Sequence, residues 1–238
     1  METLAGKLAI VTGGTRGIGR AIAERLLQEG CSVAICGRNQ ATVDAAVAEM
    51  HQLGTIVGIA ADVTQPSQVE HFFSQVDRQF GGLDILVNNA GEGVFRKVGD
   101  MTVDDWRRNI DLNLNGAFYC AHAALSRFAK RGGGFIVNIS SLAAKNPFSG
   151  GAGYNASKFG LNGFTEALML DHRYDNVRVC SVMPGSVATD FSGDAKRAAD
   201  TGWKVAAQDV AEVVSMVLRM PARTMVSQVE MRPSKPKK

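Results

Sequence analysis

Short runs of apolar residues alternate along the chain with longer segments in which apolar residues recur every three or four positions. A short apolar run is typical of a strand buried on both faces, and the wider spacing is typical of a helix with one apolar face. The runs predict strands at residues 8–12, 32–36, 56–60, 85–89, 135–140, 177–182 and, last, 224–231. Strands and helices that alternate in this way predict a parallel, doubly wound α/β sheet.

The helices are predicted between these strands. Three of them end near Gly30, Gly54 and Gly81, and a glycine commonly terminates a helix. Two further helical stretches cover 102–130 and about 208–220. The polar, glycine-containing segment 190–206 shows no such periodicity. Because it follows the end of a strand, we expect it to form a lid over a crevice.

Size and composition narrow the class of protein. A chain of 238 residues with 45% hydrophobic and 21% charged residues suits one ordered domain over residues 1–238, with 232–238 as a flexible basic tail. A net charge of +3 is too small to indicate a nucleic acid partner. The four cysteines and four histidines lack metal-ligand spacing, so no metal is expected. No apolar run is long enough for a membrane span or a signal peptide, which favours a cytoplasmic location.

The first strand leads directly into TGGTRGIG at residues 12–19, and a helix follows. Gly13 permits a tight turn, Gly17 lets a pyrophosphate approach the backbone, and Gly19 lets the helix pack closely on the sheet. The helix N-terminus adds free N–H groups for phosphates, and no Gly-Lys-Ser/Thr follows to indicate a nucleotide triphosphatase. The pattern predicts a dinucleotide site, the alternative being a turn with incidental glycines.

The end of the second strand bears on the choice of dinucleotide. Here the sequence is Gly37-Arg38-Asn39, which offers no carboxylate for the ribose hydroxyls of NAD but does offer a guanidinium for the 2′-phosphate of NADP. Arg16, inside the glycine loop, is a second phosphate partner. The alternative is that both arginines point into solvent.

Tyr154 and Lys158 stand four residues apart in YNASK. On a helix such residues share one face, with Cβ atoms about 5–6 Å apart. An ammonium about 5 Å from a phenol, at an effective dielectric near 20, favours the phenolate by about 3 kcal/mol, or about two pKa units. The spacing alone favours the alternative, an amphipathic helix with the ring inward and the lysine outward.

Seven motifs, taken together, resemble the short-chain dehydrogenase/reductase family of the classical type in order and spacing. The motifs are TGGTRGIG at 12–19, DV at 62–63, NNAG at 88–91, Asn113 in DLNLNG, ISS at 139–141, YNASK at 154–158 and PGSVAT at 184–189. They cover the chain from about residue 7 to 231. The resemblance implies a three-layer Rossmann fold whose seven-stranded parallel sheet has the order 3-2-1-4-5-6-7 with helices on both faces.

The resemblance also implies a role for each matching position. Tyr154 would be the general acid, and Lys158 would hold the nicotinamide ribose and lower the pKa of the phenol. Ser141, rather than its neighbour Ser140, would bind the substrate oxygen, and Asn113 would hold a water that links Lys158 to solvent. The residues expected to bind NADP(H) are Gly13, Thr15, Arg16, Gly17, Ile18, Gly19, Arg38, Asp62, Val63, Asn88, Ala90, Gly91, Tyr154, Lys158, Pro184, Gly185, Val187 and Thr189. Structural roles stay open for Ser141, as a turn cap, and for Asn113, as a partner of the backbone in a bent helix.

These features predict an NADPH-dependent oxidoreductase that reduces a carbonyl to a secondary alcohol. Hydroxyl donors at the carbonyl oxygen stabilise the charge that develops there as hydride arrives from the cofactor. Among relatives, the chain resembles 3-oxoacyl-[acyl-carrier-protein] reductases in character, so the expected substrate is a small molecule, free or carrier-bound, and Arg96 and Lys97 could attract an acidic one.

Two alternatives stay open: a dehydrogenase of a small hydroxy acid, sugar or polyol, and a non-catalytic NADP(H)-binding sensor or assembly module. The family resemblance implies a homo-oligomer, either a tetramer or a dimer. The C-terminal end VEMRPSKPKK departs from the glycine-containing turn that is usual in the family, and this end commonly contributes to subunit contacts.

Overall fold

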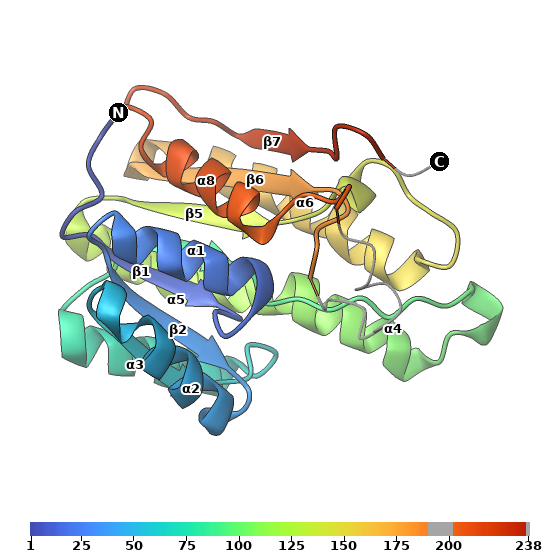
Figure 1. Ribbon diagram of the computed structural model, residues 1–238, viewed down its shortest axis with the longest axis horizontal. Helices are drawn as coiled ribbons and strands as arrows, with labels where there is room; N and C mark the ends of the chain where they lie inside the picture. The colour runs from blue at the N-terminus through green and yellow to red at the C-terminus, as the bar shows by residue number, and fades with distance from the viewer. Residues whose placement is uncertain (190–201, 237–238) are drawn as a thin grey trace.

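The structure, a computed structural model, describes residues 1–189 and 202–236. All the strands belong to one parallel sheet, and helices cover both of its faces (Figure 1). The strands are β1 (Leu8–Thr12), β2 (Ser32–Gly37), β3 (Ile56–Ala60), β4 (Ile85–Asn88), β5 (Gly134–Ile139), β6 (Val177–Pro184) and β7 (Gln228–Met231). Their order, β3-β2-β1-β4-β5-β6-β7, confirms the predicted topology.

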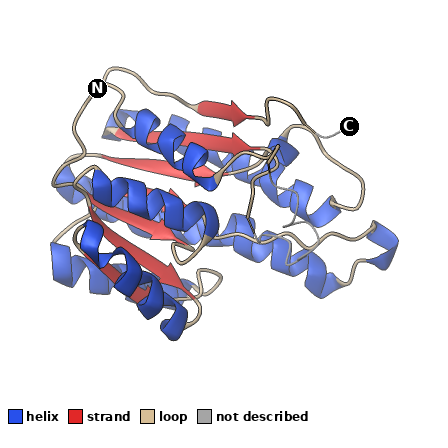
Figure 2. Cartoon of the chain, in the orientation of Figure 1, coloured by secondary structure: helices blue, strands red, loops and turns tan. Residues whose placement is uncertain are grey.

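The helices form a layer on each face of the sheet, as Figure 2 shows in blue against red. They are α1 (Gly17–Gln28), α2 (Gln40–Met50), α3 (Pro66–Phe80), α4 (Val103–Ile110), α5 (Gly116–Arg131), α6 (Ala152–His172) and α8 (Ala207–Leu218). Side chains of α1, α2 and α8 form one hydrophobic core with the sheet, and those of α3, α5 and α6 form the other. This is the three-layer arrangement that the family resemblance implied.

Strand β1 shows why its run is apolar throughout. Ala9 and Val11 face the core under α1, whereas Leu8 and Ile10 face the core under α3 and α5. Side chains alternate between the two faces of a strand, so a strand between two helical layers needs apolar residues at every position.

The crevice for a ligand is expected where neighbouring crossovers leave the sheet in opposite directions. Strand β1 pairs with β2 on one side and with β4 on the other, which places this point at the carboxyl ends of β1 and β4. In Figure 1 the arrowheads of the strands point toward the side of the molecule that holds α4 and the beginning of α6.

Most predicted elements match the observed ones within two residues at each end, and two differ more. The last strand begins at Gln228 rather than 224, because a turn in which the Thr224 N–H donates to the Pro221 carbonyl at 2.8 Å delays its start. The predicted helix over 102–130 is divided into α4, a π-helical segment η3 (Asp111–Asn115) and α5. Such a wide turn inside a helix is frequent at functional sites.

Most of the expected lid, residues 190–201, lies outside the described residues. At its far end, Val205 forms a backbone bridge with Val187. The expected tail makes contacts over its described part: a Cβ built at Gly185 would lie 3.3 Å from Pro233 Cδ. Within the described ranges, no helix combines the length and apolar character that crossing a membrane requires.

Candidate active site

The glycine loop between β1 and α1 has the backbone form that its sequence predicts. Gly13 and Gly17 have φ values of +64° and +57°, the left-handed region that favours glycine. A Cβ at Gly19 would lie 2.3 Å from the Gly13 carbonyl oxygen, so this position tolerates no side chain. In the described part of the chain no side chain caps the start of α1, and its first turn carries no acidic residue. The N–H groups of that turn are therefore available to an anion.

Thr12 and Asn89 fix this loop, and the sequence analysis missed both. The Asn89 amide donates to the Thr12 carbonyl at 2.9 Å and to the Gly13 carbonyl at 3.2 Å. The buried Thr12 hydroxyl oxygen accepts from the N–H groups of Asn89 and Ala90, each at 3.0 Å. Polar residues at the ends of two adjacent strands were the available signal, since parallel strands bring their carboxyl ends to one edge.

Arg16 belongs to this loop, and Arg38 follows the strand β2 that touches it. Arg16 is the exposed residue that precedes α1, and Arg38 is exposed directly after β2. A Cβ at Gly37 would lie 3.2 Å from Thr15 Cγ2, so the end of β2 touches the glycine loop. Neither guanidinium has a hydrogen bond or ion pair with any residue that the structure describes. Both are therefore open to a phosphate.

Three of the predicted cofactor residues serve the fold. Val63 is buried, with Cγ2 3.0 Å from a Cβ built at Gly116. Asn88 is also buried, and its amide donates to the Ala117 carbonyl at 3.2 Å and to Asn138 Oδ1 at 2.9 Å. Asp62 Oδ1 accepts from the N–H and hydroxyl of Thr64 at 3.0 and 2.8 Å, which forms a local turn. Two of these side chains, those of Val63 and Asn88, therefore point into the protein.

Ile18, Ala90 and Val187 pack against the two hydrophobic cores. The segment 184–189 continues β6 toward the glycine loop, where Thr189 Cγ2 lies 3.5 Å from a Cβ built at Gly17. The Gly185 N–H donates to the Met231 carbonyl at 2.8 Å, which ties the segment to the end of β7. The structure thus brings the first and the last of the seven motifs together.

Tyr154, Ser141 and Lys158 meet at the beginning of α6. Tyr154 and Lys158 are both buried, and Tyr154 shares a side-chain hydrogen bond with Ser141. Lys158 Nζ lies 5.8 Å from the centre of the Tyr154 ring and donates to the Ile139 carbonyl at 2.9 Å. The Ser141 hydroxyl oxygen also accepts from the Ala143 N–H at 3.1 Å, so the turn-capping role applies as well.

Burial changes the proton affinity of this pair in a way that the sequence argument did not include. It raises the pKa of Tyr154, and the Ser141 hydrogen bond opposes that rise. It also lowers the pKa of Lys158 to about 8. The spacing of Tyr154 and Lys158 reveals only the attraction between the two charges. Loss of hydration works against both charged forms, so the phenol stays protonated at neutral pH.

Asn113 lies in the π-helical segment and is fully buried. Its amide donates to the Glu92 carbonyl at 2.9 Å and to Ser157 Oγ at 3.0 Å, and its Oδ1 accepts from the Glu92 N–H at 3.0 Å. A Cβ at Gly91 would lie 2.8 Å from Asn113 Oδ1 and 3.8 Å from Lys158 Nζ. Asn113 therefore joins the turn after β4 to α6 beside Lys158, in agreement with the backbone-binding alternative, and its water relay remains a prediction.

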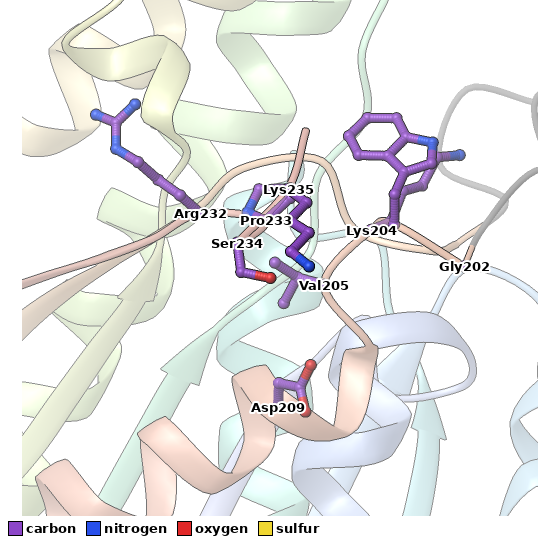
Figure 3. Close-up of a pocket in the computed structure, with 9 residues that line it drawn as sticks. Gly202, Lys204, Val205, Asp209, Arg232, Pro233, Ser234 and Lys235 are labelled. Atoms are coloured by element: carbon purple, nitrogen blue, oxygen red, sulfur yellow. The ribbon is translucent and has the colours of Figure 1, made fainter. Parts of the chain in front are cut away.

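A pocket of about 550 Å³ is lined by the residues that Figure 3 draws as sticks. It lies next to the segment 184–189, because its lining residue Val205 forms a bridge with Val187. Its described lining is formed by Gly202, Trp203, Lys204, Val205, Asp209, Arg232, Pro233, Ser234 and Lys235. Lys204, Arg232 and Lys235 make the lining basic, and Arg232 also pairs with Glu230 at 3.0 Å.

Comparison with known proteins agrees with this geometry. The family model described as short chain dehydrogenase matches residues 7–200. A 3alpha-hydroxysteroid dehydrogenase of Mediterraneibacter gnavus is 38% identical over 191 residues, 79% of this chain and 76% of that protein. Dehydrogenase/reductase SDR family member 4 of Oryctolagus cuniculus is 40% identical over 80% of this chain and 74% of its own length.

Solved structures extend the similarity over the whole chain. A metagenomic short-chain oxidoreductase in complex with NADP has a TM-score of 0.86 and 32% identity, and the match covers 99% of this chain and 100% of that one. An alcohol dehydrogenase from the archaeon Thermococcus sibiricus, complexed with 5-hydroxy-NADP, has a TM-score of 0.88 and 26% identity, with 98% and 99% covered.

Proposed function

Since this chain belongs to the short-chain dehydrogenase/reductase family of oxidoreductases, we propose that it reduces a ketone to a secondary alcohol with NADPH. The observation that carries the proposal is the meeting of Tyr154, Ser141 and Lys158 at the carboxyl edge of the sheet, next to the turn after β4 that also touches the glycine loop. Tyr154 and Ser141 are hydroxyl donors for one carbonyl oxygen, and Lys158 is a buried ammonium close to the phenol.

The residues present fit a dinucleotide with a 2′-phosphate. The positive φ values at Gly13 and Gly17 and the uncapped start of α1 form a cradle for the pyrophosphate. Arg38 and Arg16 would hold the 2′-phosphate, since a planar fork of donors suits phosphate geometry. Two structural relatives were solved with NADP or 5-hydroxy-NADP bound, which supports the choice. Lys158 would hold the ribose hydroxyls of the nicotinamide half.

The bound cofactor supplies the hydride, and the protein supplies the proton. Tyr154 donates its phenolic proton to the carbonyl oxygen, while the Ser141 hydroxyl donates a hydrogen bond to the same oxygen. The nearby Lys158 ammonium then stabilises the phenolate. The raised pKa keeps the phenol of Tyr154 protonated at neutral pH, the form in which it can donate to the carbonyl oxygen.

Replacing Tyr154 by Phe tests this assignment. The variant is expected to bind NADPH with unchanged affinity and to lose about 10²–10⁴-fold in turnover, because a positioned acid contributes about that much. The assay is NADPH oxidation across acetoacetyl thioesters, diketones, quinones and keto sugars. Wild-type binding of NADPH without turnover of any carbonyl would favour the sensor alternative, and full activity in Tyr154→Phe would remove the acid role.

A 3-oxoacyl thioester is the second, finer candidate for the substrate. The basic pocket beside Gly185 supports it, because a carrier arm contains a phosphate that Lys204, Arg232 and Lys235 could attract. The test compares acetoacetyl-coenzyme A with acetoacetyl-N-acetylcysteamine, which lacks the phosphates. Equal kcat/KM values for the two thioesters would exclude recognition of the carrier phosphate.

We also propose a cytoplasmic homo-oligomer, a dimer or a tetramer. Support for assembly comes from Trp106, Phe118 and Phe159, large apolar side chains left exposed on α4, α5 and α6. Light scattering after gel filtration measures the mass in solution. A monomer of 25.3 kDa at micromolar concentration would contradict the proposal.

A further inference from the structure

Two phenylalanine rings lie beside the ring of Tyr154. The centre of the Phe95 ring is 5.4 Å from that of Tyr154, at an interplanar angle of 77°. The Phe148 ring is 6.4 Å from Tyr154 and 5.6 Å from Phe95. The three rings therefore form one cluster at the start of α6, and we refer to Phe95 and Phe148 as the aromatic wall.

The two wall residues come from different loops, and the structure fixes both loops. Phe95 follows β4, where Asn109 exchanges two hydrogen bonds with the backbone of Val94, each at 3.2 Å. Phe148 precedes α6, where its carbonyl accepts from the Asn155 amide at 3.0 Å and from the Gly151 N–H at 3.2 Å. The wall is thus held in place on both sides.

A backbone bridge between Arg96 and Gly151 joins these two loops. Gly151 also makes room for the second ring, since a Cβ there would lie 2.6 Å from Phe148 Cε2. The absence of a side chain at Gly151 lets the Phe148 ring lie over the first turn of α6, directly before Tyr154.

The wall leaves apolar surface open to a ligand. Tyr154 is 8% exposed, whereas Phe148 is 45% exposed. A phenyl ring offers no conventional hydrogen-bond donor or acceptor, so hydroxyl or carboxylate groups pressed against it would lose hydration without compensation. An apolar group would instead remove both surfaces from water.

Two arginines near the wall, Arg96 and Arg108, are paired within the protein. Arg96 Nε lies 3.0 Å from Asp105, and Arg108 makes two hydrogen bonds to the Glu92 carboxylate at 2.9 and 3.1 Å. The expectation that Arg96 attracts an acidic substrate is weakened by this pairing, although Lys97 remains exposed.

From this arrangement we propose that Phe95 and Phe148 select ketones that carry a bulky apolar group, such as a fused ring system, next to the carbonyl. The inference rests on the proposed reductase function and disfavours small hydroxy acids, sugars and polyols. The apolar group would lie on the aromatic wall while the carbonyl oxygen meets Tyr154 and Ser141. Phe148 is the main specificity determinant, because its ring is exposed whereas Phe95 is half-buried.

The test measures NADPH oxidation with 2-decalone, 2-butanone and dihydroxyacetone. Wild-type protein is expected to have at least tenfold higher kcat/KM for 2-decalone than for either small ketone. Phe148→Ala is expected to raise the KM for 2-decalone about tenfold, with kcat and the 2-butanone constants within twofold. Phe148→Leu, which keeps apolar bulk, is expected to recover most of the loss.

Tyr174→Ala is the matched control, an exposed aromatic residue beyond the far end of α6, and it is expected to change none of these constants. Equal losses with both ketones in Phe148→Ala, or a wild-type preference for dihydroxyacetone, would overturn the inference and leave the reductase function intact. If the wild-type protein oxidised NADPH with none of the ketones tested, the proposed function itself would be overturned. Unchanged circular dichroism and NADPH affinity establish that Phe148→Ala is folded.

Discussion

Lys158 Nζ lies 5.8 Å from the centre of the Tyr154 ring and donates a hydrogen bond to the carbonyl of Ile139, at the end of β5. The ammonium is thus held beside the phenol by a strand that belongs to the centre of the sheet. The position is costly for a charge, because Lys158 is 4% exposed and burial lowers its pKa from 10.5 to about 8.

This shift predicts how stability depends on pH. Between pH 8 and 10.5 the unfolded chain holds a proton on Lys158 that the folded chain has released, so the free energy of unfolding rises with pH. The cost of burying the charge is fully present below pH 8 and amounts to about 3 kcal/mol. Urea unfolding of wild-type protein is expected to show that rise relative to Lys158→Met. Lys130→Met, which removes an exposed lysine, is the control and should follow wild type.

The neighbouring residues Ser140 and Ser141 differ in their hydrogen-bond partners. Ser141 bonds to Tyr154, whereas the Ser140 hydroxyl is buried with no partner among the described residues. Ser141→Ala is expected to lower kcat about 10²-fold, because it removes a donor at the carbonyl oxygen. Ser140→Ala is expected to keep kcat within threefold and to leave stability equal or higher, because it removes an unsatisfied polar group. Steady-state kinetics and thermal unfolding of the two variants measure these effects. A lower kcat in Ser140→Ala than in Ser141→Ala would contradict the assignment of Ser141 as the donor.

Arg38 is expected to select NADPH over NADH. Arg38→Asp places a negative charge where the 2′-phosphate would bind, so the KM for NADPH should rise at least tenfold while that for NADH stays equal or falls. Arg173→Asp makes the same charge change in η5 (Arg173–Asp175), directly before β6 and so at the opposite, amino-terminal edge of the sheet. If both substitutions raised the KM for NADPH equally, the effect would come from the net charge of the protein and not from a contact between Arg38 and the 2′-phosphate.

Gly19 and Gly163 are both helical glycines, with opposite surroundings. A Cβ at Gly19 would lie 2.3 Å from backbone and from Asn89 Nδ2, whereas a Cβ at Gly163 would meet no atom within 4 Å. Gly19→Ala is expected to shift the glycine loop and to weaken NADPH binding at least tenfold. Gly163→Ala is expected to raise stability by about 0.5–1 kcal/mol, since alanine favours a helix. Calorimetric titration with NADPH and thermal unfolding measure the two effects, and unchanged NADPH binding in Gly19→Ala would contradict the first.

The sheet was predictable because burial on both faces requires apolar residues at every strand position, as Leu8–Thr12 illustrates. The last strand was harder to predict from the sequence. In the described sheet β7 is an edge strand paired with β6, and its residues alternate between exposed and half-buried. The predicted catalytic residues do meet in space. The predicted lowering of the Tyr154 pKa was wrong, because burial raises it. Spacing in a sequence reveals which charged side chains lie close to one another. It does not reveal how much hydration each side chain loses when the protein folds.

Other parts of the site depend on partners that are distant in sequence. Asn89 belongs to the NNAG motif, but its role depends on the Thr12 carbonyl, 77 residues earlier, which the motif does not reveal. Phe95 and Phe148 lie in irregular loops, where periodicity gives no direction to a side chain. Asn88 shows the opposite case, since its motif matched a cofactor position while its side chain is bonded to Asn138 inside the protein.

The bond between the Gly185 N–H and the Met231 carbonyl has a practical consequence for handling the protein. A purification tag fused after residue 238 would extend from the segment that lines the basic pocket, and it would compete for the surface next to the site. The amino terminus lies at the other side of the molecule (Figure 1), so a tag placed there would leave the assays free of that interference.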